Sequence, residues 1–138
     1  MTNVFHRNPQ GQSPIAVGGR GIFLIDAKGN KYIDASGGAA VSCLGHGDHE
    51  VIQAIKKQAE LLAFAHTGFF SSEPAEKLAD FLIEQAPPNF GKVYFVSGGS
   101  EAVEASLKLA RQYHMENGEP ERCKFIARRQ SYHGNTLG

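Results

Sequence analysis

The sequence has no excess of charge of either sign and no long apolar run. Its 14 basic and 14 acidic side chains give a formal net charge of zero, which removes the electrostatic basis for binding nucleic acid or an anionic membrane surface. No apolar stretch approaches the roughly 18 residues that a bilayer-spanning helix needs. The first residues also lack the apolar segment of a signal peptide. We therefore expect a globular protein with neither a nucleic-acid partner nor a membrane association.

Cysteine is scarce, since only Cys43 and Cys123 are present, far apart and without the spacing of a disulfide framework or a zinc site. This usage favours a reducing compartment, so we expect a cytoplasmic protein. The histidines lack ligand-like spacing as well, and we predict no metal ion. We interpret four of them as surface groups or as supporting groups around a site: His46, His49, His66 and His114.

Short apolar segments separated by turn-forming residues predict a small β meander near the start of the chain. Its expected strands are residues 15–17, 21–25 and 31–33, and the cluster 26–30 joins the last two. Apolar residues then recur at helical spacing, which predicts an amphipathic helix that begins near His49.

The second half of the sequence alternates between helix and strand signals. A serine cap, a proline in the first turn and acidic residues predict a helix that begins near residue 72 and stops at Pro87. Residues 92–96 and 123–127 have the length and composition of strands, and a helix is expected between them. Strands that alternate with helices favour an α/β fold with a parallel sheet.

The strongest local signal is the glycine-rich turn at residues 96–102, between a predicted strand and a predicted helix. Free N–H groups at a helix start hold a phosphate well, and glycine lets the anion approach. Because the turn has neither the P-loop nor the G-x-G-x-x-G spacing, a phosphate ligand other than a nucleotide is favoured. A turn without a ligand is the alternative. We interpret Glu101 and Glu104 as acids that stabilise the helix start, not as a catalytic pair.

The second signal is Ser131-Tyr132-His133-Gly134, which follows the next predicted strand. It is therefore expected at the same edge of the sheet, where α/β proteins bind ligands. The ring of Tyr132 could stack there on a heteroaromatic ligand. The alternative is a tyrosine that packs on the core edge beside a histidine that faces water.

Ordered motifs cover nearly the whole chain, namely residues 21–34, 44–46, 74–78, 97–104, 108–111 and 132–134. In content and order they resemble the class III aminotransferases of the omega-amino acid:pyruvate type. These are pyridoxal-phosphate (PLP) enzymes of fold type I, usually homodimers. The resemblance implies an N-terminal β meander with an active-site-bordering loop in residues 1–47. Residues 48–138 would then be the first, incomplete part of the PLP-binding large domain, with its mixed or parallel sheet.

The same resemblance implies the roles of individual residues. Gly99 and Ser100 would bind the PLP phosphate, and Tyr132 would stack on the pyridine ring with His133 beside it. The segment between the meander and the first long helix borders the active site in this family. The resemblance therefore gives the expected substrate-pocket residues Ala40, Val41 and Ser42.

Such an enzyme transfers an amino group from an amine or amino acid to a 2-oxo acid or aldehyde. Its Schiff-base lysine is expected beyond Gly138, because Lys92, Lys108 and Lys124 lie on elements that place them away from the ligand edge. We therefore assign no catalytic residue within this chain and expect the isolated 138 residues to be an inactive N-terminal part. The alternatives are a non-catalytic remnant or interaction module, and another fold-type I activity such as an aminomutase or a decarboxylase.

Overall fold

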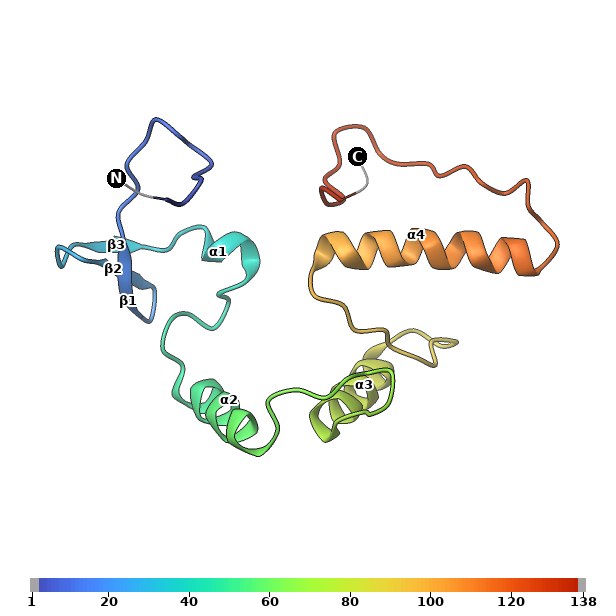
Figure 1. Cartoon of the computed structure of the whole chain (residues 1–138), viewed down its shortest axis with the longest axis horizontal. Helices are drawn as coiled ribbons and strands as arrows, with labels where there is room; N and C mark the ends of the chain where they lie inside the picture. Colours follow the sequence, from blue (N-terminus) through green and yellow to red (C-terminus); the bar gives the residue numbers. More distant parts are fainter. Residues whose placement is uncertain (1–2, 137–138) are drawn as a thin grey trace. The chain divides into compact units, whose positions relative to one another are not determined.

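The computed structural model describes residues 3–136 and divides the chain into two compact units, with the division between Phe70 and Ser71. Figure 1 labels the strands and helices in chain order. Among the described residues, no helix is both long enough and apolar enough to cross a bilayer.

The first unit contains the expected meander as an antiparallel sheet of order β1-β2-β3, made of β1 (Ala16–Arg20), β2 (Phe23–Asp26) and β3 (Lys31–Ile33). The meander prediction is thus confirmed, although β1 runs on through two glycines that the sequence pattern had left outside the strand. Gly19 has a packing reason to be glycine. A Cβ there would come within 2.7 Å of the His46 Cβ, so the side chain of His46 uses the space.

The turn between β2 and β3 is organised by the carboxylate of Asp26, which is only 5% exposed. It accepts hydrogen bonds from the backbone N–H groups of Lys28 and Asn30 at 2.9 and 2.8 Å. The Asn30 amide and the Tyr32 hydroxyl each donate to its second oxygen at 2.9 Å. These bonds, led by the one from the Asn30 side chain, lower the pKa of Asp26. The turn cluster read from the sequence is therefore held by one ionised side chain.

Two helical segments follow the sheet in the first unit. The short turn α1 (Gly37–Ala40) lies in the loop after β3. The long helix α2 (His49–Leu61) begins where the apolar periodicity predicts it. Asp48 caps α2, since its side chain accepts a hydrogen bond from the Val51 N–H at 2.9 Å.

The second unit contains α3 (Glu73–Gln85) and α4 (Gly99–Glu116). Both helices are predicted by the sequence, and α3 ends just before Pro87, as expected. One detail differs. Ser72 is at the cap position of α3, but its side chain makes no capping bond, whereas the hydroxyl of the preceding Ser71 donates to the carboxylate of Glu76.

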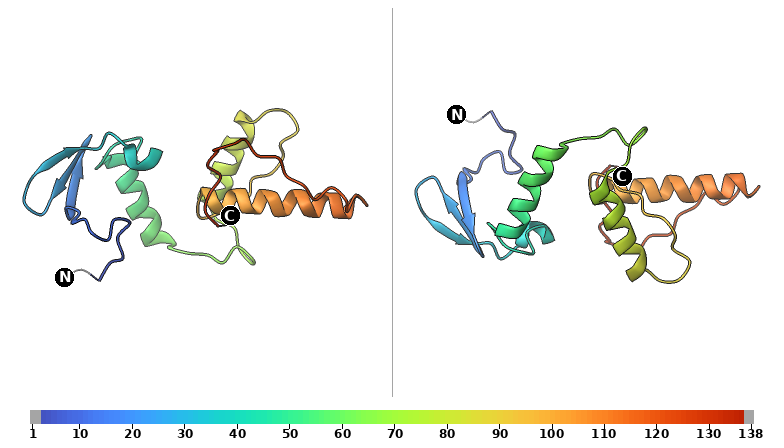
Figure 2. Two further views of the ribbon diagram at one scale, coloured as in Figure 1. Left: turned by 90° about the horizontal axis from the view of Figure 1, so that it is seen from above. Right: turned by 90° about the horizontal axis from the view of Figure 1, so that it is seen from below.

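The strands predicted at residues 92–96 and 123–127 are not formed within the described residues, where β1–β3 are the strands. Both segments run as irregular connections before and after α4 (Figures 1 and 2). The physical reason is that a strand exists only through hydrogen bonds to a neighbour, and a parallel strand buried on both faces needs several. In residues 3–136 no apolar side chain is buried, so these runs have no core to enter.

Candidate functional site

The start of α4 has the features of an anion site. Gly98 is extended (φ −169°, ψ 175°) and offers no side-chain cap, and the first helical bond runs from the Ala102 N–H to the Gly98 carbonyl at 3.0 Å. The N–H groups of Gly99, Ser100 and Glu101 precede that bond, so they have no helix carbonyl to donate to. A Cβ added at Gly99 would meet no atom within 4 Å, which leaves its backbone open to an approaching ligand.

A loop from the end of the chain docks on this helix start. The backbone N–H of Asn135 donates to the Ser100 Oγ at 3.3 Å, and that hydroxyl donates to the Asn135 Oδ1 at 3.3 Å. Gly134 lies against the same residue, because an added Cβ would come within 2.8 Å of the Ser100 Cα. The glycine-rich turn at the start of α4 and the Tyr-His-Gly motif are therefore neighbours in space (Figure 1). The bonded residues Ser100 and Asn135 are 35 positions apart in the sequence.

Glu104 lies one turn further along α4. Its carboxylate forms an ion pair with Lys108 at 3.0 Å. Lys108, through its hydrogen bond and its charge, is the main cause that lowers the pKa of Glu104, and Thr136 adds to it. Glu104 is thus paired along the helix, and Lys108 lies on the surface of α4.

Tyr132 and His133 directly precede Gly134 on the docked loop. Both side chains are exposed, and Tyr132 is 85% exposed. The loop therefore presents an uncovered aromatic ring two residues before the glycine that touches Ser100. All four residues expected to hold the cofactor, Gly99, Ser100, Tyr132 and His133, belong to this helix start and its docked loop.

The three expected pocket residues lie in the first unit, at and after α1. This turn is left-handed: φ is 55° at Gly37, 57° at Gly38, 58° at Ala39 and 70° at Ala40. Glycine adopts such angles freely, whereas an L-residue with a Cβ is strained by about 1–2 kcal/mol. Two consecutive alanines are therefore held in a conformation that other contacts must stabilise.

Val41 and Ser42 line a cavity of about 280 Å³ at the start of α2, whereas Ala40 does not. The cavity lies wholly within the first unit. Its other lining residues are Cys43, Leu44, Gly45, Gly47, Asp48, Val51 and Ile52.

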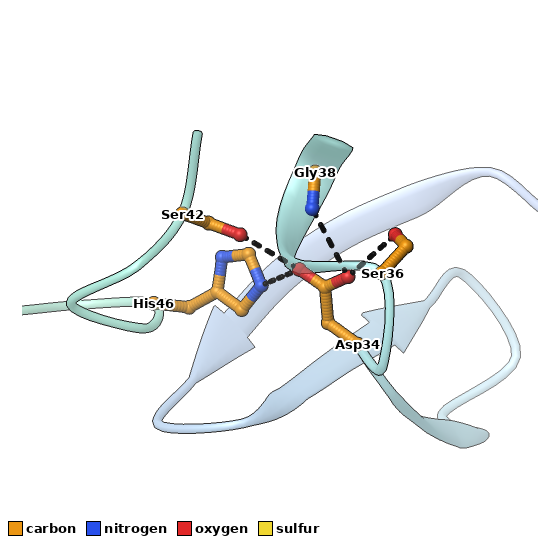
Figure 3. A network of polar contacts seen from close by, with 5 residues as sticks. All are labelled: Asp34, Ser36, Gly38, Ser42 and His46. Carbon is orange, nitrogen blue, oxygen red and sulfur yellow. Dashed lines mark hydrogen bonds and ion pairs between the residues drawn. The ribbon is translucent and has the colours of Figure 1, made fainter. Parts of the chain in front are cut away.

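The loop that carries these residues is gathered around the carboxylate of Asp34 (Figure 3). Its Oδ2 accepts from the Ser42 Oγ at 3.0 Å and lies 2.9 Å from the His46 Nε2. Its Oδ1 accepts from the Ser36 Oγ at 3.1 Å and from the Gly38 N–H at 3.4 Å. Of these partners, Ser42 and then His46 contribute most to lowering the pKa of Asp34. His46, interpreted from the sequence as a surface or supporting group, is thus a half-buried partner of Asp34.

Comparison with known proteins places this chain in a family. Residues 7–138 match the family Aminotransferase class-III. An uncharacterized aminotransferase of Schizosaccharomyces pombe is 48% identical over 134 residues, which is 97% of this chain. The chain belongs to the class III aminotransferases. It spans 29% of the length of that yeast relative, and similarly small shares of other aminotransferases.

Solved structures of omega-transaminases agree with this assignment. An engineered thermostable omega-transaminase matches 97% of this chain with a TM-score of 0.89 and 32% identity, over 31% of its own length. The omega-transaminase of Pseudomonas jessenii in complex with PMP matches 94% with a TM-score of 0.85 and 32% identity, also over 31% of its length. The fold described above is therefore that of the corresponding part of these transaminases.

Class III aminotransferases use PLP, and the start of α4 fits the phosphate of that group. Three N–H groups without helix acceptors, an open face over Gly99 and the Ser100 hydroxyl form a donor set suited to a dianion. The adjacent loop offers the exposed ring of Tyr132 for a flat heteroaromatic ring.

Two sets of contacts around these sites were not predicted from the sequence. Asn135 and Thr136 follow the Tyr-His-Gly motif without a pattern of their own, although Gly134 in that motif signals a close approach. Asp34 and His46 occur within quoted motifs, but their pairing is set by a loop whose course no local pattern encodes.

Proposed function

We propose that this chain supplies the phosphate and ring contacts for PLP in an aminotransferase that moves an amino group from an amine or amino acid to a 2-oxo acid or aldehyde. The observation that carries this proposal is the docking of the Tyr132 loop, through Gly134 and Asn135, onto the uncapped start of α4. Membership of the class III family supports the reaction class.

The chain's own groups would act on the cofactor by binding and orientation. The N–H groups of Gly99 and Ser100 and the dipole of α4 would hold the phosphate, and a charge at a helix start is stabilised by about 0.3–1 kcal/mol. The Ser100 hydroxyl, which now donates to Asn135, would turn its hydrogen to a phosphate oxygen. Asn135 would go on donating its backbone N–H to Ser100, so the loop would stay docked.

Tyr132 would then cover one face of the pyridine ring, with His133 beside it. When bound, PLP supplies an electron sink for the charge that develops at the substrate carbon. Fixing the ring plane is the contribution of this chain, and Tyr132 orders only two side-chain torsions to make it.

The remaining features of the proposal concern the complete enzyme. Lys108 is paired with Glu104, so we assign the covalent tether and proton transfer to a lysine outside residues 1–138 and expect no turnover from these residues alone. Ala40, Val41 and Ser42 would border the substrate. We propose a cytoplasmic homodimer in which residues 1–47 form a region distinct from the PLP-binding domain.

The test is a PLP titration of an enzyme that contains this chain, followed by the absorbance of the bound cofactor, together with a transamination assay. We expect Tyr132→Ala to weaken PLP binding by about threefold to tenfold, the range of an aromatic contact. Tyr132→Phe keeps the ring and should bind PLP normally. The matched control is Tyr113→Ala, which removes an exposed tyrosine of α4 from outside the proposed site.

Normal PLP affinity and turnover in Tyr132→Ala would remove the ring contact from the proposal. An enzyme that binds PLP through Tyr132 but transfers no amino group to any 2-oxo acid or aldehyde would instead contradict the reaction class.

A further inference from the structure

We infer that Asp34 and His46 are positioning residues, which hold the loop between them so that Ala40–Ser42 are presented to the amino donor in one fixed conformation. The inference rests on the proposed function, because it assigns the donor preference of that reaction to two residues outside the pocket segment. It is carried by the four-bond network of Figure 3 and by the way the two ends of the loop are anchored.

Both ends of the loop are fastened to the same short stretch of the meander. The Asp34 N–H donates to the Ile22 carbonyl at 2.8 Å. His46 exchanges two backbone hydrogen bonds of 2.8 Å with Gly21, the neighbour of Ile22. The segment from Asp34 to His46 is thus a closed loop whose ends meet at adjacent residues, the geometry of an Ω-loop.

The side chains at the two ends then cross-link the loop at its base. The Asp34 side chain is 9% exposed and that of His46 is 23% exposed, so water is largely kept from their contact at 2.9 Å. Because an ionised carboxylate only accepts, the His46 Nε2 carries the hydrogen in this bond. The bond at the loop base thus requires a ring of His46 that carries a hydrogen on Nε2.

The carboxylate of Asp34 has no acceptor capacity left for catalysis. Two oxygens offer about four lone-pair positions, and four donors fill them: Ser36, Gly38, Ser42 and His46. A general base must have a free position for the substrate proton. Asp34 therefore acts through the loop and not on the substrate.

The network reaches both sides of the left-handed turn α1. Before the strained alanines, the Gly38 N–H donates to Asp34; after them, the Ser42 hydroxyl donates to the same carboxylate. The N–H groups of Val41 and Ser42 also close onto the Gly37 carbonyl at 2.8 and 2.9 Å. Without Asp34 the turn would keep these backbone bonds but lose the bonds from Gly38 and Ser42 to the carboxylate. We expect Ala40 then to relax toward a negative φ, which would move Val41 and Ser42.

The test compares variants in the PLP-loaded enzyme that contains this chain. Asp34→Asn replaces one acceptor oxygen by a donor, and His46→Leu removes the ring donor. His46→Gln is the conservative variant, because its amide nitrogen can take the place of Nε2. His114→Leu is the matched control, since it removes a histidine that bonds a carboxylate, that of Glu119, outside this loop.

Two measurements are made on each variant: amide hydrogen exchange over residues 35–47, with residues 103–116 of α4 as the internal reference, and kcat and KM for one small and one bulky amino donor. We expect Asp34→Asn and His46→Leu to speed exchange at Val41 and Ser42 about tenfold, with the reference unchanged. We also expect them to change the ratio of the two donors' KM values severalfold, with PLP affinity unaltered. His46→Gln and His114→Leu should resemble the unmodified enzyme.

Unchanged exchange at Val41 and Ser42 in both Asp34→Asn and His46→Leu would overturn the inference. Faster exchange with an unaltered donor ratio would overturn it too, because the network would then be structural only. Failure of the proposed function is distinguished by the unmodified enzyme. That enzyme would then bind no PLP or transfer no amino group, whatever the exchange rates of the variants.

Discussion

Gly134 lies so close to Ser100 that no side chain fits between them: a Cβ on residue 134 would come within 2.8 Å of both the Ser100 Cα and its Oγ. The contact is with backbone at the first turn of α4, so it cannot be relieved by a rotamer change of a long side chain. It sets how closely the Tyr132 loop approaches the helix start that we propose as the phosphate site.

Gly134→Ala should therefore weaken PLP binding by displacing the loop. The variant adds the clash to the strain of a positive φ of 102°, and we expect at least about a tenfold loss of PLP affinity, equal to about 1.4 kcal/mol. Gly118→Ala is the matched control. It too places alanine at a positive φ, 73°, but its Cβ would meet no atom within 4 Å. Equal PLP affinities for the two variants in a titration would contradict a role for the Gly134 contact.

Acid should destabilise the first unit by protonating Asp26 and Asp34. The pKa values of both are lowered by hydrogen bonds to the ionised form. A carboxylate of lowered pKa contributes stability that is fully present above its unfolded pKa of about 3.9. That contribution is lost as the pH falls through the still lower folded pKa. We expect the Lys28 and Asn30 amide resonances to hold their folded positions down to about pH 4 and to change below it.

Asp26→Asn supplies the comparison for the acid titration. The amide cannot ionise, so the change of the Lys28 and Asn30 resonances below about pH 4 should disappear in this variant. The change that comes from protonation of Asp34, seen at the Gly38 amide, should stay. If the unmodified chain and Asp26→Asn had the same profile below pH 4, the turn would not depend on this carboxylate.

Ala40→Gly tests the strain of the left-handed turn. Glycine removes about 1–2 kcal/mol of strain at a φ of 70° but adds unfolded-state entropy of about 0.4–1 kcal/mol, so we expect a net stabilisation between zero and about 1.6 kcal/mol. Ala54→Gly, inside α2, should destabilise by about 1 kcal/mol. Denaturant unfolding of the enzyme that contains the chain would measure both, and destabilisation of similar size in the two variants would refute the strain.

The sequence predicts those elements whose signals are local. The meander, the start of α2 near His49 and the end of α3 before Pro87 depend on turn residues, apolar periodicity and a helix breaker, all within a few positions. The strands expected at residues 92–96 and 123–127 depend on hydrogen bonds to neighbours, which local composition cannot supply. These two were the wrong predictions of the fold.

The candidate site divides in the same way. The helix start at Gly99 and the aromatic ring of Tyr132 are visible as patterns because each needs only its own short motif. Their proximity through Asn135 depends on the course of the chain between them, as does the bond from Asp34 to His46 across 12 positions. Positive φ at Ala39 and Ala40 runs against local preference, so it follows from those longer contacts and not from the residues themselves.

The last prediction follows from the absence of buried apolar side chains among residues 3–136. Hydrophobic burial is the main term that offsets the conformational entropy of a folded chain, and here Ile126 and Phe5 are almost fully exposed at 101% and 94%.

Residues 1–138 alone should therefore self-associate, with light scattering that rises with concentration and strong binding of a dye specific for apolar surface. Ile126→Lys should lower the scattering, because it replaces the fully exposed apolar side chain of segment 123–127 by a second positive charge beside that of Lys124. Gln53→Lys adds the same charge at an exposed polar position of α2 and should lower it less. A chain that stays monomeric and binds no such dye must bury its apolar side chains in an arrangement other than the one described, which would contradict the exposure of residues 123–127.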